Sequence, residues 1–256
     1  MKHKEIAKVI SQESIATGVY SMWIQTKDIA AKAVAGQFIS VYCKDGAKLL
    51  PRPISICEVN KEEGTLRIVY RVVGGGTTEM SGYVSGDDID ILGPLGNGFM
   101  QREGKKAILI GGGIGIPPMV QLGKELKNIV KVQTVAGYRD ELFLTDELEK
   151  NGDVYIATED GSAGTKGTVI DAIKACAVTG DVIYACGPTP MLRAIKEYAL
   201  ANDIECQISL EEKMACGIGA CLGCVCKSKE KDHHTNVNNK RICKDGPVFL
   251  AQEVEL

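Results

Sequence analysis

Residues 107–118, Ala-Ile-Leu-Ile-Gly-Gly-Gly-Ile-Gly-Ile-Pro-Pro, decide how the second half of the chain is interpreted. They predict a buried strand that ends in a glycine turn and is followed by a helix. Such a turn brings backbone N–H groups and a helix N-terminus to a diphosphate. The dinucleotide fingerprint G-x-G-x-x-G is not met, because Pro118 takes the third glycine position after Gly113 and Gly115. The turn could also merely close a strand–helix unit.

A second segment supports a nucleotide site. Residues 186–191, Cys-Gly-Pro-Thr-Pro-Met, directly follow the apolar run 182–185. A cysteine there is expected at the carboxyl end of the sheet, where α/β proteins bind ligands. Cys186 alone would be a buried structural cysteine, but together with the glycine turn it favours a nicotinamide nucleotide. The candidate contacts are Gly111, Gly112, Gly113, Gly115, Cys186, Gly187 and Pro188.

The segments around this turn alternate between strands and helices. Helical spacing recurs at 119–126, 169–176 and 191–199, where Pro190 suits a first turn and Thr168 with Asp171 can form a capping box. This alternation predicts a parallel sheet covered on both faces. The predicted strands are 107–110, 130–136, 154–157, 182–185 and 204–210.

The first hundred residues have the rhythm of an antiparallel barrel. Runs at 37–43, 53–59 and 66–72 are rich in β-branched and aromatic residues, and turn signals separate them. Within the barrel, Arg52-Pro53-Ile54-Ser55 offers a cation for a phosphate and a hydroxyl for a flavin. Further flavin contacts are predicted at Val69-Tyr70-Arg71 and at the 74–77 turn, which includes Gly76 and Thr77.

The chain changes character again after residue 210, where it becomes rich in glycine and cysteine and too poor in apolar residues for a core of its own. Such a segment usually needs a metal. The predicted architecture is therefore an α+β multidomain protein with an antiparallel barrel (1–100), an α/β domain (101–210) and a small C-terminal subdomain (211–256). The glycine- and proline-rich stretch 93–98 is the natural first boundary.

Four cysteines of this segment have the plant-type [2Fe–2S] spacing, C-x4-C-x2-C-x18-C. Structural zinc usually uses two C-x2-C pairs, and a redox disulfide would need only two thiols. Cys226 falls outside the register and is the spare cysteine. His233 and His234 follow no Rieske spacing, so these two histidines are expected to be exposed loop residues. The predicted cluster ligands are Cys216, Cys221, Cys224 and Cys243.

Composition narrows the classes of function. The net charge of −3 over 256 residues gives no reason to expect a nucleic acid or an anionic membrane as partner. The most apolar stretch, 107–120, is too short to span a bilayer, and no signal-peptide core precedes it. A soluble protein of the cytoplasm is expected, and the ten cysteines are not expected to form a disulfide scaffold.

With these motifs in view, the chain resembles the ferredoxin–NADP reductase superfamily, in which an FAD barrel precedes a nicotinamide domain. The matching motifs are RPIS at 52–55, GGGIGIPP at 111–118 and CGPTPM at 186–191. EEKMACGIGACLGC at 211–224 and RICKDGPVF at 241–249 resemble the electron-transfer subunits of NAD-linked, class B dihydroorotate dehydrogenases, nearly end to end. One departure from the wider superfamily is Ile54, where an aromatic residue often stacks on the flavin.

The resemblance implies a function without acid–base catalysis in this chain, since the cofactors carry the chemistry. An FMN-containing partner would oxidise dihydroorotate, and electrons would pass singly through [2Fe–2S] to FAD and as a hydride to NAD⁺. The complex would be a heterotetramer with two copies of each chain, and the loop from Cys216 onward would face the partner. The alternatives are the related subunits of bifurcating transhydrogenases, which tend to carry aspartate at the position of Cys216, and of sulfur-reducing hydrogenases.

The choice of nucleotide rests on the resemblance more than on the residues. Arg139, just after the second strand of the α/β domain, could meet a 2′-phosphate or stack on adenine. Glu159 and Asp160, after the third strand, would repel that phosphate if they line the site. NAD is therefore expected.

Overall fold

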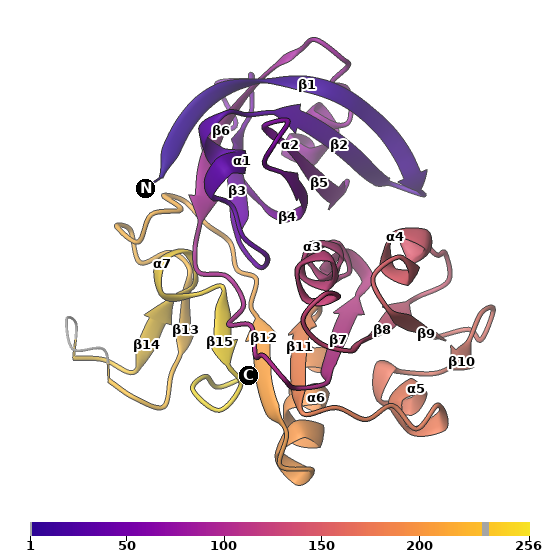
Figure 1. Cartoon of the computed structure of the whole chain (residues 1–256). Coiled ribbons are helices and arrows are strands. Elements are labelled where there is room, and N and C mark those ends of the chain that lie inside the picture. The colour runs from indigo at the N-terminus through magenta and orange to yellow at the C-terminus, as the bar shows by residue number, and fades with distance from the viewer. Residues whose placement is uncertain (1, 232–235) are drawn as a thin grey trace.

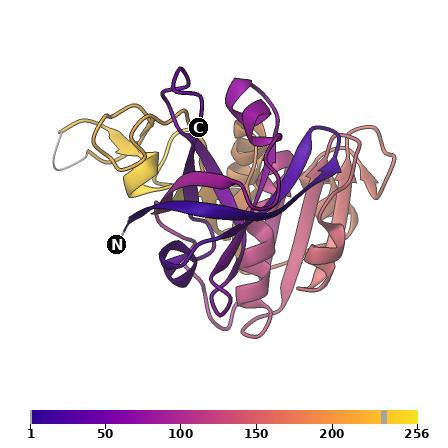
Figure 2. The ribbon, with the colours of Figure 1, turned by 90° about the horizontal axis from the view of Figure 1, so that it is seen from above.

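The computed structural model describes residues 2–231 and 236–256, which form a closed barrel, a seven-stranded sheet and a two-stranded hairpin. The barrel lies at the top of Figure 1, the sheet below it, and the C-terminal segment beside both. Figure 2 shows the same arrangement from above, with the yellow C-terminal segment far from the outer strands β9 and β10 of the sheet. The three-part architecture predicted from the sequence is confirmed.

The barrel is antiparallel throughout, with strands in the order β1-β2-β5-β4-β3-β6. Side chains that alternate along the strands fill its interior, among them Met22, Ile39 and Ile68, each fully buried. Its elements are β1 (His3–Ala16), β2 (Val19–Gln25), α1 (Asp28–Lys32), β3 (Phe38–Tyr42), β4 (Arg52–Asn60), β5 (Thr65–Arg71), α2 (Gly75–Met80) and β6 (Asp88–Leu95).

The sheet has the order β10-β9-β8-β7-β11-β12-β15, and the strands from β10 to β12 are parallel. Helices α3 and α4 cover the face toward the barrel, and α5 and α6 cover the other (Figure 1). The predicted parallel sheet with helices on both faces is confirmed. Its elements are β7 (Ala107–Gly112), η1 (Gly113–Gly115), α3 (Pro117–Leu126), β8 (Val132–Tyr138), α4 (Thr145–Glu149), β9 (Asp153–Thr158), β10 (Thr165–Lys166), α5 (Val169–Ala175), β11 (Val182–Cys186), α6 (Thr189–Ala201) and β12 (Glu205–Ser209).

The predicted capping box begins α5. Asp171 N–H donates to Thr168 Oγ1 at 3.3 Å, and Thr168 N–H donates to the Asp171 carboxylate at 2.8 Å. The hydrogen bonds from Thr168 hold the pKa of the Asp171 carboxyl below its usual value. A local sequence pattern thus sets where this helix starts.

The C-terminal segment contains β13 (Val225–Lys227), β14 (Asn239–Arg241), α7 (Ile242–Asp245) and β15 (Val248–Leu250). It shares a core with both neighbours, because Met214 and Ile242 belong to the same apolar cluster as Phe38 of the barrel. Strand β15 pairs antiparallel with β12 and so extends the sheet at its edge. The sequence analysis did not predict this strand, since three residues are too few to show a period.

Polar contacts fix the barrel against the helices of the sheet. Arg67 of β5 is only 7% exposed, and it donates to Ser21 Oγ at 2.8 Å and to Glu147 of α4 at 2.9 Å. Beside it, Lys124 of α3 pairs with Glu58 of β4 at 2.9 Å. These bonds hold the two parts in one relative position and so fix the walls of the space between them.

Removing the Arg67 side chain should destabilise the protein, because the Glu147 carboxylate and the Ser21 hydroxyl would lose their hydrogen-bond donor in a partly buried interface. We expect Arg67→Ala to lower the free energy of unfolding by about 3 kcal/mol. Urea unfolding followed by the fluorescence of Trp23, the chain's single tryptophan, measures it. The control is Lys131→Ala, which removes an exposed pair with Asp153 and should change stability by no more than about 0.5 kcal/mol. Equal losses in the two variants would contradict this account.

Candidate functional site

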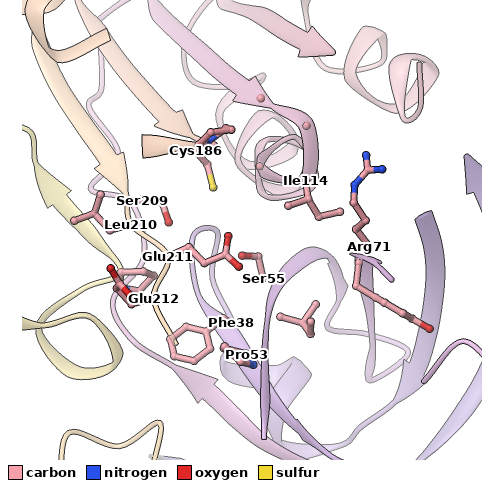
Figure 3. A pocket seen from close by; sticks show the side chains of 18 of the residues that line it. Phe38, Pro53, Ser55, Arg71, Ile114, Cys186, Ser209, Leu210, Glu211 and Glu212 are labelled. Carbon is pink, nitrogen blue, oxygen red and sulfur yellow. The ribbon is translucent and has the colours of Figure 1, made fainter. Parts of the chain in front are cut away.

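A cavity of about 750 Å³ lies where the barrel, the carboxyl ends of the sheet strands and the C-terminal segment meet. Figure 3 shows the Cys186 thiol and the Glu211 carboxylate directed into it, with Ser55 and Arg71 on the barrel side. It lies at the edge of a parallel sheet where α/β proteins bind ligands. Its lining comes from segments 52–55, 69–71, 112–115, 186–189 and 209–214, together with Phe38, Val73, Thr77, Leu192 and Pro247.

The structure brings most of the predicted site residues together around this cavity. Two lie just behind the lining. An added Cβ on Gly76 would collide with the Arg52 guanidinium, and one on Gly111 would lie 2.8 Å from Ile116 Cα. The predicted residues that line it are Arg52, Pro53, Ile54, Ser55, Val69, Tyr70, Arg71, Thr77, Gly112, Gly113, Gly115, Cys186, Gly187 and Pro188.

The barrel side of the cavity has the chemistry for a flavin and its diphosphate. Arg52 donates to the Leu50 carbonyl and lies against Gly76, and none of the ion pairs among the described residues includes Arg52 or Arg71. Thr77 Oγ1 accepts from the Val73 and Gly74 amides at 2.9 and 3.2 Å and so shapes the turn beside Arg52. Cations that lack carboxylate partners in a concave site suit a phosphate group.

On the sheet side, the two predicted nucleotide segments pack against each other. An added Cβ on Gly115 would strike the Cys186 carbonyl, and one on Gly112 would strike Met191 Sδ. Gly113 adopts φ +53°, a left-handed conformation that suits glycine. Gly115 is therefore needed for backbone contact between the β7 turn and the β11 loop. Gly112, Gly113 and Gly115 all line the cavity.

Burial sets the ionisation of the side chains at this end. It raises the pKa of the Cys186 thiol to about 12, against the effect of a Ser209 hydrogen bond, so this thiol is neutral at pH 7. Burial, helped by the neighbouring Glu212, also raises the pKa of the Glu211 carboxyl. The sequence analysis missed Glu211 and Phe38 as lining residues. The only signal for Glu211 was its position directly after a predicted strand.

A second cavity of about 550 Å³ shares Arg71 and Gly113 with the first. Arg139 lines it, as do Asp140 and Glu141, whereas Glu159 and Asp160 do not. Glu141 accepts a hydrogen bond from the Thr17 amide at 2.9 Å, which ties this loop to the β1–β2 turn. Arg139 therefore lies within reach of a ligand bound along the glycine turn, with carboxylates different from those considered in the sequence analysis.

The predicted cluster ligands lie on one loop and on α7. The Cys216 sulfur accepts from the backbone amides of Ile218, Ala220 and Cys221 at 3.3 to 3.5 Å. Gly217 and Gly219 have positive φ angles of 66° and 88°, which turn these amides toward the sulfur. The amide of Cys243 donates to the Cys224 sulfur at 3.4 Å and links the two parts of the ligand set.

The donor set fits an iron–sulfur cluster. Burial opposes ionisation of Cys216, but the amides of Ile218, Cys221 and Ala220 outweigh it and lower its pKa to about 6. Burial and the nearby Cys224 raise the pKa of Cys243, as expected for thiols crowded together. Among residues 2–231 and 236–256, no three His, Cys, Asp or Glu side chains converge on one metal-ion position. A two-iron cluster needs no such convergence, because each iron takes two thiolates.

The remaining residues of this region stand apart from the ligand set. Cys226 is half-buried on β13, where it pairs in register with Lys240 of β14. His233 and His234 lie outside the described residues. Within the described part of the chain, no helix is long and apolar enough to cross a lipid bilayer.

Paired substitutions test the ligand set. Cys216→Ser should abolish or halve the iron bound per chain, because it removes the thiolate on which three amides converge. Cys226→Ser should retain full iron and sulfide, since this thiol is not required. Iron and acid-labile sulfide analysis of the anaerobically purified chain, with its visible absorption spectrum, measures both. Equal iron loss in the two variants would contradict the assignment.

Comparisons with known proteins match this geometry. Residues 211–255 match the family model of the iron–sulfur cluster binding domain of dihydroorotate dehydrogenase B. The electron transfer subunit of dihydroorotate dehydrogenase B (NAD(+)) from Caldanaerobacter subterraneus subsp. tengcongensis is 43% identical over 254 residues, covering 99% of both chains. The subunit of the same name from Listeria monocytogenes serovar 1/2a is 47% identical over 255 residues, covering 97% of this chain and 98% of the relative.

Solved structures agree with the fold. The structure of an NADH-dependent reduced ferredoxin-NADP oxidoreductase, studied for flavin-based electron bifurcation, has a TM-score of 0.87 and 31% identity, covering 98% of this chain and 90% of that one. A ferredoxin NADP+ reductase from Neisseria gonorrhoeae, with bound FAD and NADP, has the same fold at a TM-score of 0.66 and 17% identity, covering 78% and 91%. Because these relatives are 43% and 47% identical to it over nearly their whole length, the chain belongs to the family of electron transfer subunits of dihydroorotate dehydrogenase B (NAD(+)).

Proposed function

We propose that this chain carries electrons from a partner that oxidises dihydroorotate, through a [2Fe–2S] cluster and FAD, to NAD⁺. The observation that carries the proposal is continuity between the sites. Residues 209–214 line the large cavity, and Cys216 follows two residues later. A cluster on that loop would lie next to a flavin in the cavity, and electron transfer requires such short separations.

The residues around the cavity form two sets, one for each of two nucleotides. Arg52 to Ser55, Val69 to Arg71, and Gly76 with Thr77 would hold FAD. Gly111 to Gly113, Gly115, and Cys186 to Pro188 would hold NAD(H). When bound, FAD exchanges single electrons with a cluster and a hydride with a nicotinamide, which is the chemistry this pathway requires.

The chain's own residues would bind the two nucleotides and orient them. Arg52 and Arg71 offer guanidinium groups to diphosphates, and the glycine turn lets a nucleotide backbone approach β7 closely. The neutral Cys186 thiol presents a small uncharged surface at the end of β11, so it introduces no charge at the place where a nicotinamide ring would lie. Phe38 and Leu210 line the cavity with apolar surface and share an apolar cluster with Cys224 of the cluster loop, residues 216–224.

The partner is proposed to dock over the cluster loop. Cys221 is exposed there, and Ile218 and Leu222 beside it are 46% and 48% exposed. Exposed apolar side chains around a ligand cysteine suit a surface that is covered in a complex. We propose further that the partner carries FMN, that two copies of each chain assemble, that the complex is cytoplasmic, and that the three parts divide at residues 100 and 210.

A second candidate is a subunit of an electron-bifurcating oxidoreductase, which the likeness to the NADH-dependent reduced ferredoxin-NADP oxidoreductase favours. The identities of 43% and 47% with the dihydroorotate dehydrogenase B subunits exceed the 31% found there. The cysteine at position 216 also favours the first proposal, because the related bifurcating subunits tend to carry aspartate there. These observations place the first proposal ahead.

The test uses the chain co-purified with its dihydroorotate-oxidising partner. We expect NAD⁺ reduction by dihydroorotate, which disappears in Cys216→Ser while NADH-driven dye reduction by the same variant continues. The split is expected because the dye draws electrons from the flavin, which lies before the cluster when NADH is the donor. Spectra recorded at 340 nm and in the visible range measure both. A complex that bleaches only with NADPH and ignores dihydroorotate would move the bifurcating candidate ahead.

Docking over the cluster loop makes a separate prediction. Ile218→Glu should weaken the complex at least about tenfold, because a charge would be buried among apolar side chains. Its backbone amide, which serves Cys216, is retained. The control Leu200→Glu changes a residue that is 60% exposed on α6 and should leave assembly unchanged. Analytical ultracentrifugation of the mixed chains measures assembly, and unaltered affinity in Ile218→Glu would move the interface elsewhere.

A further inference from the structure

Ser40 is a buried donor without an acceptor. It lies on β3 with 0% of its surface exposed, and its hydroxyl has no hydrogen-bond partner among the described residues. Burying a hydroxyl in this way is unfavourable, because the group gives up its hydrogen bonds to water and gains none in return. Native structures rarely accept this cost unless a bound group supplies the partner.

The cluster loop covers the Ser40 hydroxyl. An added Cβ on Gly217 would lie 3.0 Å from Ser40 Oγ and 3.2 Å from Leu95 Cδ1, so the loop lies against the barrel at β3 and β6. Gly217 directly follows the ligand Cys216. Two residues before Ser40, on the same face of the strand, Phe38 lines the large cavity. Ser40 therefore lies behind the cluster loop. It shares a strand face with Phe38, which lines the cavity proposed to hold the flavin.

Three other side chains also have a buried oxygen atom without a hydrogen-bond partner, namely those of Thr26, Asp90 and Thr134. Thr26 follows β2, and Thr134 lies within β8. The contact with the loop that carries the cysteines distinguishes Ser40 from them. Sulfur atoms are the acceptors that this loop would hold once a cluster is bound.

We propose that the Ser40 hydroxyl donates a hydrogen bond to the iron–sulfur cluster, either to the Cys216 thiolate or to the inorganic sulfide beside it, and raises its reduction potential. The physical reason is charge. A hydrogen bond to sulfur stabilises the reduced cluster more than the oxidised one, because the reduced cluster carries one more negative charge. The three backbone amides that serve Cys216 act in the same direction, but Ser40 does so from outside the loop. The inference rests on the cluster of the proposed function.

The test compares potentials in the assembled complex. Ser40→Ala should lower the equilibrium constant for one-electron reduction of the cluster about fivefold, which corresponds to ~40 mV at 59 mV per tenfold. Ser40→Cys, a weaker donor, should give a smaller shift in the same direction. An anaerobic redox titration followed by the EPR signal of the reduced cluster measures both, and the flavin potential from the same titration should not move.

Controls separate this role from a packing role. Thr26→Val removes another buried hydroxyl without a partner, and it should leave the cluster potential unchanged. Iron content and melting temperature should be near wild type in Ser40→Ala, since a purely structural role would change these instead. An unchanged potential in a fully loaded Ser40→Ala complex overturns the proposal. A wild-type complex without iron and sulfide would overturn the cluster itself, which is a different failure.

Discussion

Direct backbone contact between the β7 glycine turn and the β11 loop is the constraint on which the rest of the site depends. No side chain larger than hydrogen fits at Gly115, because the backbone of Cys186 and Gly187 occupies the position that a Cβ would take. This contact places the carboxyl ends of two neighbouring strands together at one edge of the sheet. The barrel, held by Arg67 and Glu58 against α4 and α3, then closes the space opposite that edge.

Much of this arrangement could be predicted because its signals are local. The apolar runs of the parallel strands, the Thr168–Asp171 capping box and the turn signals of the barrel each lie within a few residues and were confirmed. The cysteine spacing is equally local, so the ligand set could be proposed from its pattern alone. The motifs at 52–55, 112–115 and 186–188 come from distant parts of the sequence, yet they line one cavity.

Other features depend on packing between distant segments and leave no local pattern. Strand β15 is too short to show a period and exists because β12 offers an open edge. In the sequence, Asp140 and Glu141 have the pattern of an ordinary charged loop. Only the fold shows that Glu141 accepts a hydrogen bond from the Thr17 amide of the β1–β2 turn. Ser40 sits among apolar residues of a strand, and only the fold shows that the cysteine loop lies over its hydroxyl.

The antiparallel pairing of β12 with β15 also decides how the cysteine segment is held. Ser209 pairs directly with Val248, so residues 210–247 leave the sheet and return to it at the same place. Both ends of this excursion are anchored, and the entropy cost of closing a loop grows only slowly with its length. The length of the segment can therefore change without altering the register of the sheet strands. An insertion of this kind can be acquired, lengthened or reshaped in evolution while the nucleotide domain keeps its architecture.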